Sequence, residues 1–253
     1  MRIDINADVG ESFGNYVIGQ DFELFKVITS ANIACGFHAG DFTVMNKSVQ
    51  DAKENHLSIG AHPGFPDKQG FGRRSISMSP TEIYEMVVYQ IGALQAFCRI
   101  HDVPLSHVKP HGALYNIAAK DADVAKAIAQ AVFDTIPSAI LFGLCNSELL
   151  HAGNEIGLKT AGEAFADRRY DDLGHLVDRS KPNAVLTKLE DIIKQVEHIV
   201  MHQQVETASG KLIPIQADTI CFHGDGKNVA EIVQKTREVL EAKNVKVTPL
   251  ELI

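Results

Sequence analysis

The chain has 253 residues, of which 45% are hydrophobic and 22% are charged, a balance that is typical of a folded globular protein and excludes a disordered one. Its 24 basic and 32 acidic side chains give a formal net charge of −8 at pH 7. This charge repels the phosphates of nucleic acids and the anionic surfaces of membranes. We therefore expect neither a nucleic-acid partner nor a membrane partner.

The first residues and the cysteines favour a cytoplasmic location. Asp4 and Asp8 interrupt the apolar stretch that a secretory signal needs. No apolar run approaches the roughly 20 residues of a membrane span. The cysteines are scattered and form no C-x-x-C motif, so we expect reduced thiols in the core.

Short apolar or alternating segments predict eight strands along the chain. In chain order they are expected at residues 2–7, 32–37, 57–61, 106–109, 139–144, 157–161, 219–222 and 245–248. Period-3.6 segments lie between them and predict helices at residues 44–52, 79–101, 124–133, 189–201 and 229–240. The helix at 79–101 has the clearest start, because Ser79, Pro80 and Glu82 supply an N-cap, a first-turn proline and a capping-box acid.

Alternation of strands with helices implies a parallel sheet with right-handed crossovers. Seven or eight such units of about 32 to 36 residues fit a (β/α) barrel. An open dinucleotide-binding sheet is disfavoured because no G-x-G-x-x-G motif follows the first strand. Nothing in the sequence marks a domain boundary, so we predict one barrel domain over residues 1–253.

Ionisable and amide side chains gather at the carboxyl ends of six predicted strands. In chain order they are Asp4, Asn6 and Asp8, then His38 and Asp41, His62, Lys109 and His111, Glu163, and finally His223 and Asp225. These strand ends converge on one face of a parallel barrel. A single such residue is more often a helix cap or a structural group. Together they predict one networked site, because burying unpaired ionisable groups is costly.

Two loops add arginines to this face. Gly64, Gly70 and Gly72 lead into Arg73 and Arg74, and Glu163 is followed by Arg168, Arg169 and Arg179. Guanidinium groups bind carboxylates and phosphates in a bidentate way, although any one of these arginines can equally belong to a solvated loop. The residues predicted to bind substrate or anions are Asn6, Asp41, Arg73, Arg74, Glu163, Arg168, Arg169, His223 and Asp225. The backbone amides of Gly10 and Gly14 are a further candidate anion nest.

Several familiar motifs are absent from the sequence. It contains no G-x-x-x-x-G-K-[ST], no G-x-S-x-G and no H-E-x-x-H. A divalent metal stays an open alternative, with Asp8, His38 and His62 as candidate ligands, but these residues lack the short fixed spacing of a recognisable zinc site.

Six ordered segments resemble the LamB/YcsF family over nearly the whole chain. They are DINADVGESFG (4–14), SANIACGFHAGD (30–41), GAHPGFPDKQGFGRR (60–74), VKPHGALYN (108–116), EAFADRRY (163–170) and CFHGDG (221–226). The chain departs from the usual family pattern at Ala7, where a cysteine is common, so no thiol nucleophile is expected there. A second departure is Gly226-Lys227, which leaves the nucleotide or partner contact of that loop open.

The resemblance implies a barrel of the glycoside hydrolase/deacetylase type. It also implies action with subunits B and C of an ATP-dependent 5-oxoprolinase, which opens 5-oxo-L-proline to L-glutamate while ATP, a co-substrate, is hydrolysed to ADP and phosphate. Such a reaction needs cations for phosphate and carboxylate, a base for water and an acid for the leaving nitrogen.

The residue types suggest which side chains meet these needs. Lys109 with Arg73 and Arg74 are candidate cations, Asp8 or Glu11 the candidate base, and His38 or His111 the candidate acid. The predicted catalytic set is Asp8, Glu11, His38, His62, Lys109 and His111. Two alternatives stay open: a metal-dependent deacetylase or amidohydrolase that acts alone, and a non-catalytic subunit that binds a small carboxylate.

Overall fold

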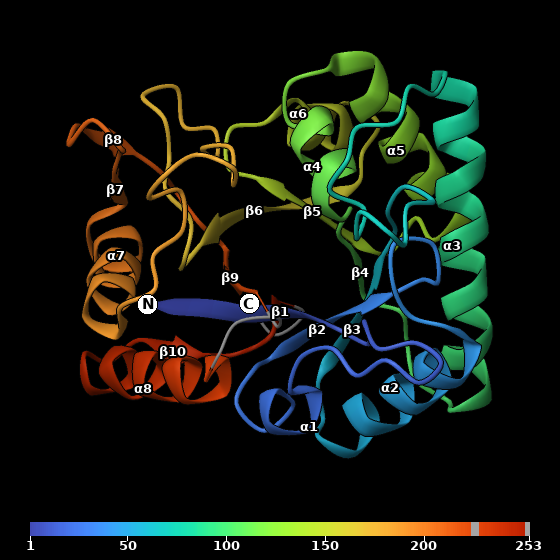
Figure 1. Cartoon of the computed structure of the whole chain (residues 1–253), viewed down its shortest axis with the longest axis horizontal. Coiled ribbons are helices and arrows are strands. Elements are labelled where there is room, and N and C mark those ends of the chain that lie inside the picture. Colours follow the sequence, from blue (N-terminus) through green and yellow to red (C-terminus); the bar gives the residue numbers. More distant parts are fainter. Residues whose placement is uncertain (224–227, 251–253) are drawn as a thin grey trace.

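Seven parallel strands close into a barrel in the computed structural model, which describes residues 1–223 and 228–250. The order around the ring is β1, β2, β3, β4, β5, β6, β9 and back to β1 (Figure 1). The strands are β1 (Arg2–Val9), β2 (Ser30–Ala34), β3 (Ser58–His62), β4 (His107–Val108), β5 (Ile140–Leu144), β6 (Lys159–Phe165) and β9 (Thr219–Phe222). The predicted (β/α) barrel is therefore confirmed, with seven strands in the ring.

The first strand closes the ring because it pairs along its length with several neighbours. Its residues 4–7 pair with β9 and its residues 6–9 pair with β2. The last predicted strand is present as β10 (Lys246–Val247), but it pairs only with Arg2 and Ile3 at the start of β1. It extends the sheet beyond the ring and is not an eighth barrel strand.

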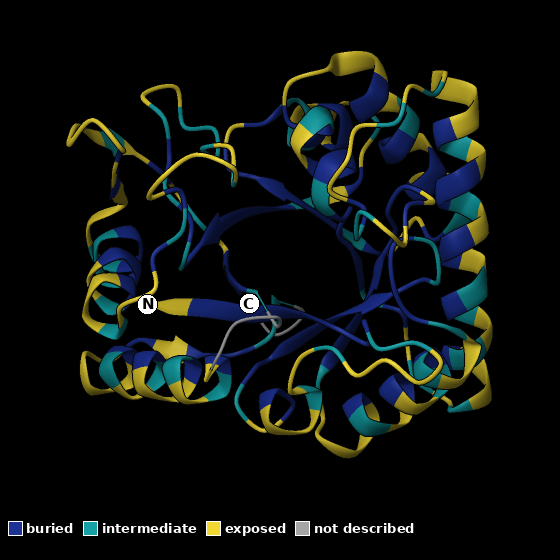
Figure 2. Cartoon of the chain, in the orientation of Figure 1, coloured by how far each residue is buried: buried dark blue, intermediate teal, exposed yellow. Residues whose placement is uncertain are grey.

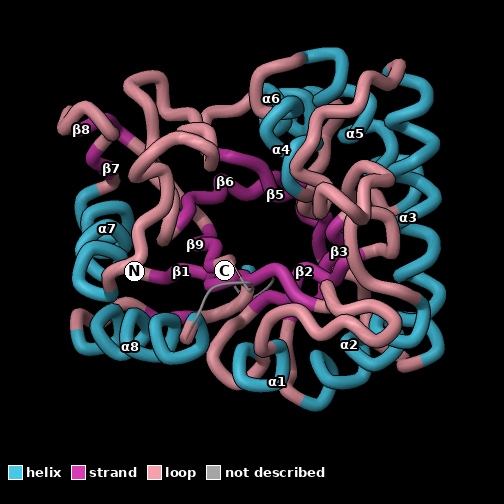
Figure 3. Tube along the Cα trace, viewed as in Figure 1, coloured by secondary structure: helices cyan, strands magenta, loops and turns pink. Residues whose placement is uncertain are grey.

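Helices cover the outside of the barrel (Figure 3). The five predicted helices are present as α2 (Phe42–Glu54), α3 (Pro80–Ile100), α5 (Ala122–Thr135), α7 (Leu189–His202) and α8 (Val229–Ala242). The sequence pattern does not predict the short α1 (Asp21–Leu24), α4 (Gly112–Ala118) and α6 (Glu148–Glu155), nor the hairpin of β7 (Gln204–Glu206) and β8 (Leu212–Pro214). These elements are short and so carry little periodicity.

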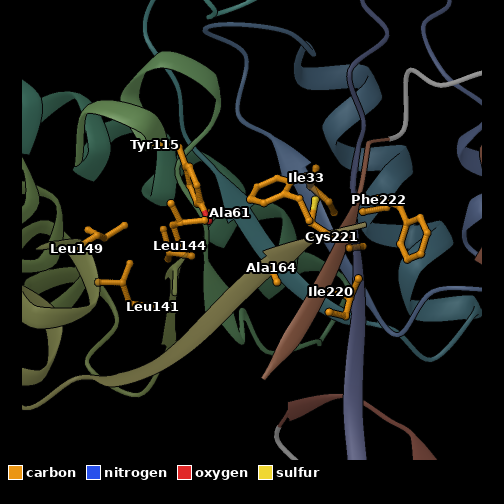
Figure 4. Packing of buried hydrophobic residues seen from close by; sticks show 14 of the residues in the cluster. Ile33, Ala61, Tyr115, Leu141, Leu144, Leu149, Ala164, Ile220, Cys221 and Phe222 are labelled. Atoms are coloured by element: carbon orange, nitrogen blue, oxygen red, sulfur yellow. The ribbon is translucent and has the colours of Figure 1, made fainter. Parts of the chain in front are cut away.

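The side chains of the barrel strands divide into two layers. On β1, Ile3 and Ile5 are buried hydrophobic residues, whereas Asp4 and Asn6 are buried polar residues that both hydrogen-bond to Thr219 of β9. Figure 2 shows that the strands are buried and that the helices are exposed on their outer faces. Figure 4 shows Ile33, Ile220 and Phe222 in the hydrophobic cluster. The interior of the barrel is therefore polar, as the alternation on β1 predicts.

None of the helices in residues 1–223 and 228–250 combines the length and apolarity needed to cross a lipid bilayer.

Candidate active site

A cavity of about 840 Å³ opens at the carboxyl ends of the barrel strands. Eight of the predicted site residues line it: Asp8, Glu11, His62, Arg73, Lys109, His111, Arg168 and His223. They come from four strand ends and from the two arginine-bearing loops. A cavity of this size holds a small organic substrate together with a phosphoryl group. We call it the barrel-mouth cavity.

Lys109 is the centre of an ionic network in the floor of this cavity. Its Nζ lies 2.9 Å from Asp8 Oδ1 and 2.8 Å from Glu163 Oε1, and its side chain is 2% exposed. It also donates a hydrogen bond to Asn6 Oδ1 at 3.1 Å. Burial opposes the charged amine, but the charges around it, Asp8 first, raise the pKa of Lys109 well above its usual value. Lys109 therefore stays protonated, and two carboxylates of the chain already share its charge.

Asp8 is ionised at neutral pH because positive charge lies next to it. Its Oδ1 accepts a hydrogen bond from Asn32 Nδ2 at 2.9 Å, and its Oδ2 lies 3.4 Å from His62 Nε2. Burial favours the neutral acid, yet His62 and Lys109 together hold the pKa of Asp8 well below its usual range. A carboxylate with so low a pKa is a poor base at neutral pH. Its position instead suits it to stabilise positive charge on His62.

Below this network, hydrogen bonds join the polar side chains in the interior of the barrel. The side-chain amide of Asn6 donates to Glu163 Oε1 at 3.0 Å and to Thr219 Oγ1 at 2.7 Å. Asp4 Oδ1 accepts from Thr29 Oγ1 at 2.6 Å. A polar floor bonded in this way holds the reactive side chains above it in fixed positions.

Three histidines and one glutamate meet beside Asp8, and we call them the histidine cluster: Glu11, His38, His62 and His111. One ligand atom of each lies within 4.8 Å of the others. Glu11 Oε1 is 3.4 Å from His38 Nε2, and His111 Nδ1 is 2.9 Å from His62 Nε2. The rings of His38 and His111 stack in parallel at 3.7 Å. This donor set is one that can hold a divalent metal ion.

The protonation of the cluster is set by its burial. Burial, with repulsion from the neighbouring histidines, lowers the pKa of His38 and of His111 well below the usual value. Both rings are therefore neutral at pH 7. With their pKa values lowered in this way, both rings bind a proton only weakly.

Two glycines of the loop after β3 lie directly against these rings. A Cβ at Gly64 would stand 2.7 Å from His38 Nδ1, and a Cβ at Gly72 would stand 2.6 Å from His38 Cβ and 2.7 Å from His111 Cδ2. Gly72 also has a φ of +63°. The glycine-rich loop thus packs closely over the histidine cluster, which requires glycine at both positions.

Three arginines bring positive charge to the lining of the cavity: Arg73, Arg168 and Arg179. Arg168 is buried, and its Nε makes no hydrogen bond with any described residue. Burial and the charge of Arg179 lower the pKa of Arg168 to about 10. Close guanidinium groups of this kind form a site for a carboxylate or a phosphate.

Arg74 and Arg169, also predicted to bind anions, are absent from the described lining of the cavity. The guanidinium of Arg74 pairs with the carboxylate of Asp67. This ion pair joins two residues of the same glycine-rich loop. The backbone amide of Arg169 donates to Ala184 O at 3.0 Å. Arg73 therefore lines the cavity, whereas Arg74, the next residue in the chain, does not.

Asp41 and the candidate anion nest also lie elsewhere. Asp41 caps α2 by accepting hydrogen bonds from its first-turn amides, and it accepts a further one from Gly14 N at 2.7 Å. Gly10 N donates to Asp21 Oδ2 at 2.8 Å. The anion nest predicted at Gly10 and Gly14 is wrong, because the chain's own carboxylates take both amides.

The remaining predicted residues lie at the edge of the cavity or beneath it. Glu163 is inside β6, which runs to Phe165 and so extends past the predicted end of that strand at residue 161. His223 Nδ1 lies 2.8 Å from Asp167 Oδ1. Asp225 lies outside the residues that the structure describes.

Three polar residues of this region are not predicted from the sequence: Asn32, His107 and Tyr115. Asn32 stands opposite Asp8 on the neighbouring strand and accepts a hydrogen bond from His107 Nε2 at 2.8 Å. Burial and the nearby charge of Glu163 raise the pKa of the cavity residue Tyr115 well above its usual value. Alternation of polar with apolar residues on β2 is a signal that could have found Asn32.

Comparison with known proteins extends over the whole chain. The model of the LamB/YcsF family matches residues 3–253. The A subunit of 5-oxoprolinase from Staphylococcus carnosus strain TM300 is 56% identical over 250 residues, which cover 99% of each chain. The protein of the same name from Staphylococcus aureus strain MRSA252 is 52% identical over 250 residues, 99% of this chain and 100% of the relative.

A solved structure has the same fold. The crystal structure of the lactam utilization protein from Thermus thermophilus superposes with a TM-score of 0.92 at 42% identity, covering 98% of this chain and 99% of that one. Together with the match to the family model over residues 3–253, this similarity shows that the chain belongs to the LamB/YcsF family.

Proposed function

We propose that this chain is the A subunit of an ATP-dependent 5-oxoprolinase, which acts with subunits B and C to open 5-oxo-L-proline to L-glutamate. The observation that carries the proposal is identity of 52–56% over essentially the full length with relatives that are named as the A subunit of 5-oxoprolinase. The barrel-mouth cavity supports it, because arginines, carboxylates and imidazole groups line it together.

The residues that line the cavity match the two functional groups of the substrate. We assign the carboxylate of 5-oxoproline to Arg73, Arg168 and Arg179, where guanidinium groups can bind it. The lactam carbonyl then faces Asp8 and the histidine cluster. The volume of about 840 Å³ exceeds what the small lactam needs and leaves room for a transferred phosphoryl group.

The reaction consumes one ATP and two water molecules. Transfer of the γ-phosphoryl group to the lactam oxygen releases ADP and makes the ring carbon electrophilic. Water adds to this carbon and gives up a proton, the ring C–N bond breaks, and the nitrogen gains a proton. A second water hydrolyses the acyl phosphate to glutamate and phosphate.

The proton transfers are assigned to His62. Its Nε2 accepts the proton from water, and the Asp8 carboxylate, 3.4 Å from this nitrogen, stabilises the imidazolium that forms. The imidazolium then supplies the proton to the leaving nitrogen. In this scheme Asp8 acts electrostatically, and Lys109 helps to keep it ionised.

The test is reconstitution of the activity. Glutamate and ADP are measured from 5-oxoproline and ATP with the purified chain alone and with subunits B and C added. We expect little turnover by the chain alone and equimolar glutamate and ADP with the partners. ATP-dependent glutamate release by the chain alone at the same rate contradicts the proposed dependence on partners.

The histidine cluster favours a second candidate, a metal-dependent amidohydrolase that acts alone. This candidate predicts hydrolysis without ATP and loss of activity when a chelator is added. The same assay without ATP and without partners separates the two functions.

A further inference from the structure

We propose that Glu11, His38, His62 and His111 bind one divalent transition-metal ion of the zinc type. The inference rests on the positions of four side chains and is tested without substrate. An ion in the cluster takes His62 Nε2 as a ligand, so the base assigned above applies to the metal-free chain only. Three features of the cluster support it: the convergence of the donor atoms, the hydrogen bonds that fix two of the rings, and the state of the third ring.

The donor atoms stand as far apart as ligands of one ion do. Zinc binds imidazole nitrogen and carboxylate oxygen at about 2.0–2.2 Å, so that two ligands of one ion are roughly 3 to 4 Å apart. Glu11 Oε1 lies 3.4 Å from His38 Nε2 and 3.8 Å from His111 Nδ1, and His111 Nδ1 lies 2.9 Å from His62 Nε2. All four residues are buried. Three nitrogens and one oxygen make a complete four-ligand set for zinc. To bind one ion, the stacked rings of His38 and His111, which are parallel to within 2°, must turn so that a nitrogen of each faces it.

Backbone carbonyls determine which ring nitrogens carry protons. His62 Nδ1 lies 2.7 Å from Lys109 O, and His111 Nε2 lies 2.7 Å from Phe71 O. A carbonyl oxygen only accepts hydrogen bonds, so both of these nitrogens must donate. In neutral rings the other nitrogens, His62 Nε2 and His111 Nδ1, are then bare lone pairs.

These two bare nitrogens face each other at 2.9 Å. Two lone pairs at this distance repel each other unless a cation lies between or beside them. The cation is either a shared proton or a metal ion. Anchoring of the far nitrogen by a backbone carbonyl is the usual outer-shell arrangement of metal-binding histidines.

His38 distinguishes the metal from the proton. It is completely buried, and neither of its ring nitrogens makes a hydrogen bond with any described residue. A proton shared by His62 and His111 leaves His38 with only the 3.4 Å contact of its Nε2 with Glu11 Oε1, whereas an ion bound by the cluster takes a nitrogen of His38 as a ligand. Gly64 and Gly72 make room for the ring, since a Cβ at either position would collide with it.

Asp8, a ligand candidate from the sequence, stands outside this set. Its Oδ1 is taken by Lys109 and Asn32, and its Oδ2 faces His62 at 3.4 Å. Glu11, His62 and His111 line the barrel-mouth cavity, so an ion in the cluster is reachable from it.

The test uses the metal alone and no substrate. The purified full-length chain is freed of metal by dialysis against a chelator and titrated with Co²⁺, followed by visible absorption, and with Zn²⁺, followed by calorimetry. We expect one equivalent of each ion to bind and a Co²⁺ spectrum typical of four nitrogen and oxygen ligands.

The variants His38→Ala and Glu11→Gln should each weaken binding at least about 100-fold, which is more than loss of an outer-shell partner costs. The matched control is the double variant His198→Ala and His202→Ala, which removes a histidine pair on α7 and should leave binding unchanged. Thermal unfolding shows that each variant is folded, and Glu11→Gln preserves the volume of the side chain it replaces.

Absence of binding by the wild-type chain overturns the proposal. So does binding that survives both cluster variants or is lost in the α7 control. Because no substrate, ATP or partner is present, a negative result leaves the proposed 5-oxoprolinase activity untouched, and failure of that activity leaves this result untouched.

Discussion

Lys109 shows how a single side chain can stabilise two buried acidic groups. Its amine lies within 3 Å of carboxylate oxygens of both Asp8 and Glu163. An unpaired buried carboxylate is strongly destabilising, so one lysine supports two of them. The consequence for function is that Lys109 has little charge left for a ligand, so we propose that the arginines that line the cavity bind the anion.

Arg73 and Arg74 are adjacent in sequence but differ in position, and their variants should differ in kinetics. Arg73→Ala removes a guanidinium from the cavity wall and should cost about 1.5–3 kcal/mol of transition-state binding, which is roughly a 10- to 150-fold fall in kcat/KM. Arg73→Lys should rescue little, because lysine lacks the planar fork. Arg74→Ala is the control. It loses the contact with Asp67, outside the cavity, so a kcat/KM as low as that of Arg73→Ala argues against this assignment.

His107 offers a pH test at the residue scale. Burial, with the charge of Lys109, lowers its pKa to about 3, below the value of about 6.5 in an unfolded chain. The unfolded state therefore binds more protons between these values, and His107 destabilises the fold progressively as pH falls from about 6.5 toward 3. At pH 5 this amounts to roughly 2 kcal/mol.

The variant His107→Gln removes the titrating group and keeps a donor toward Asn32. The free energy of unfolding, measured by urea at pH 7 and at pH 5, should fall less for this variant than for the wild type. An identical fall in the two proteins means that His107 is not held neutral in the folded chain.

At the scale of elements, the loop after β3 packs so closely against the histidine cluster that there is no room for a side chain at Gly72. Gly72→Ala places a Cβ 2.6 Å from His38 at a φ of +63°. Gly14→Ala is a matched control, because Gly14 also has a positive φ, +53°, but a Cβ there meets nothing within 4 Å. Each substitution incurs a backbone cost of roughly 1–2 kcal/mol.

Only Gly72→Ala should also displace the two histidine rings. We expect its kcat in the assembled enzyme to fall at least about 100-fold, with that of Gly14→Ala near normal. Equal activity of the two variants shows that the close packing of this loop has no role in the site.

The elements also show what the sequence can and cannot predict. Long helices with caps, such as the one that begins after Ser79, and the alternation on β1 are predictable because each pattern is local. The pairing of β10 with Arg2 and Ile3 is not, since register depends on a partner at the opposite end of the chain. Short elements such as α4 depend on packing rather than on periodicity.

The same distinction holds for the site. The residue types at strand ends are visible in the sequence, and eight of the predicted residues line one cavity. Their partners are not visible: Arg74 is paired with Asp67, and Asp41 caps α2. Sequence reveals which side chains are able to do chemistry, whereas only the fold determines which of them are already occupied by neighbours.

At the scale of the whole molecule, the barrel gathers residues from distant parts of the chain at one end. Asp8, Lys109 and Glu163 are brought together around one amine. Helices surround the ring of strands (Figure 1), and buried polar side chains such as Asp4 and Asn6 project from β1, so the interior is available for polar chemistry. Family membership and this architecture together support a catalytic role for the barrel mouth.

The central claim is that this network is catalytic, and turnover by the Asp8→Asn variant tests it most directly. The wild-type and variant chains are each assembled with subunits B and C, and glutamate formation from 5-oxoproline and ATP is measured. Asn preserves the shape of the side chain but removes the charge beside His62 and Lys109. We predict that the assembled variant turns over about 10²- to 10⁴-fold more slowly. A folded, assembled variant with turnover near that of the wild type would contradict this claim.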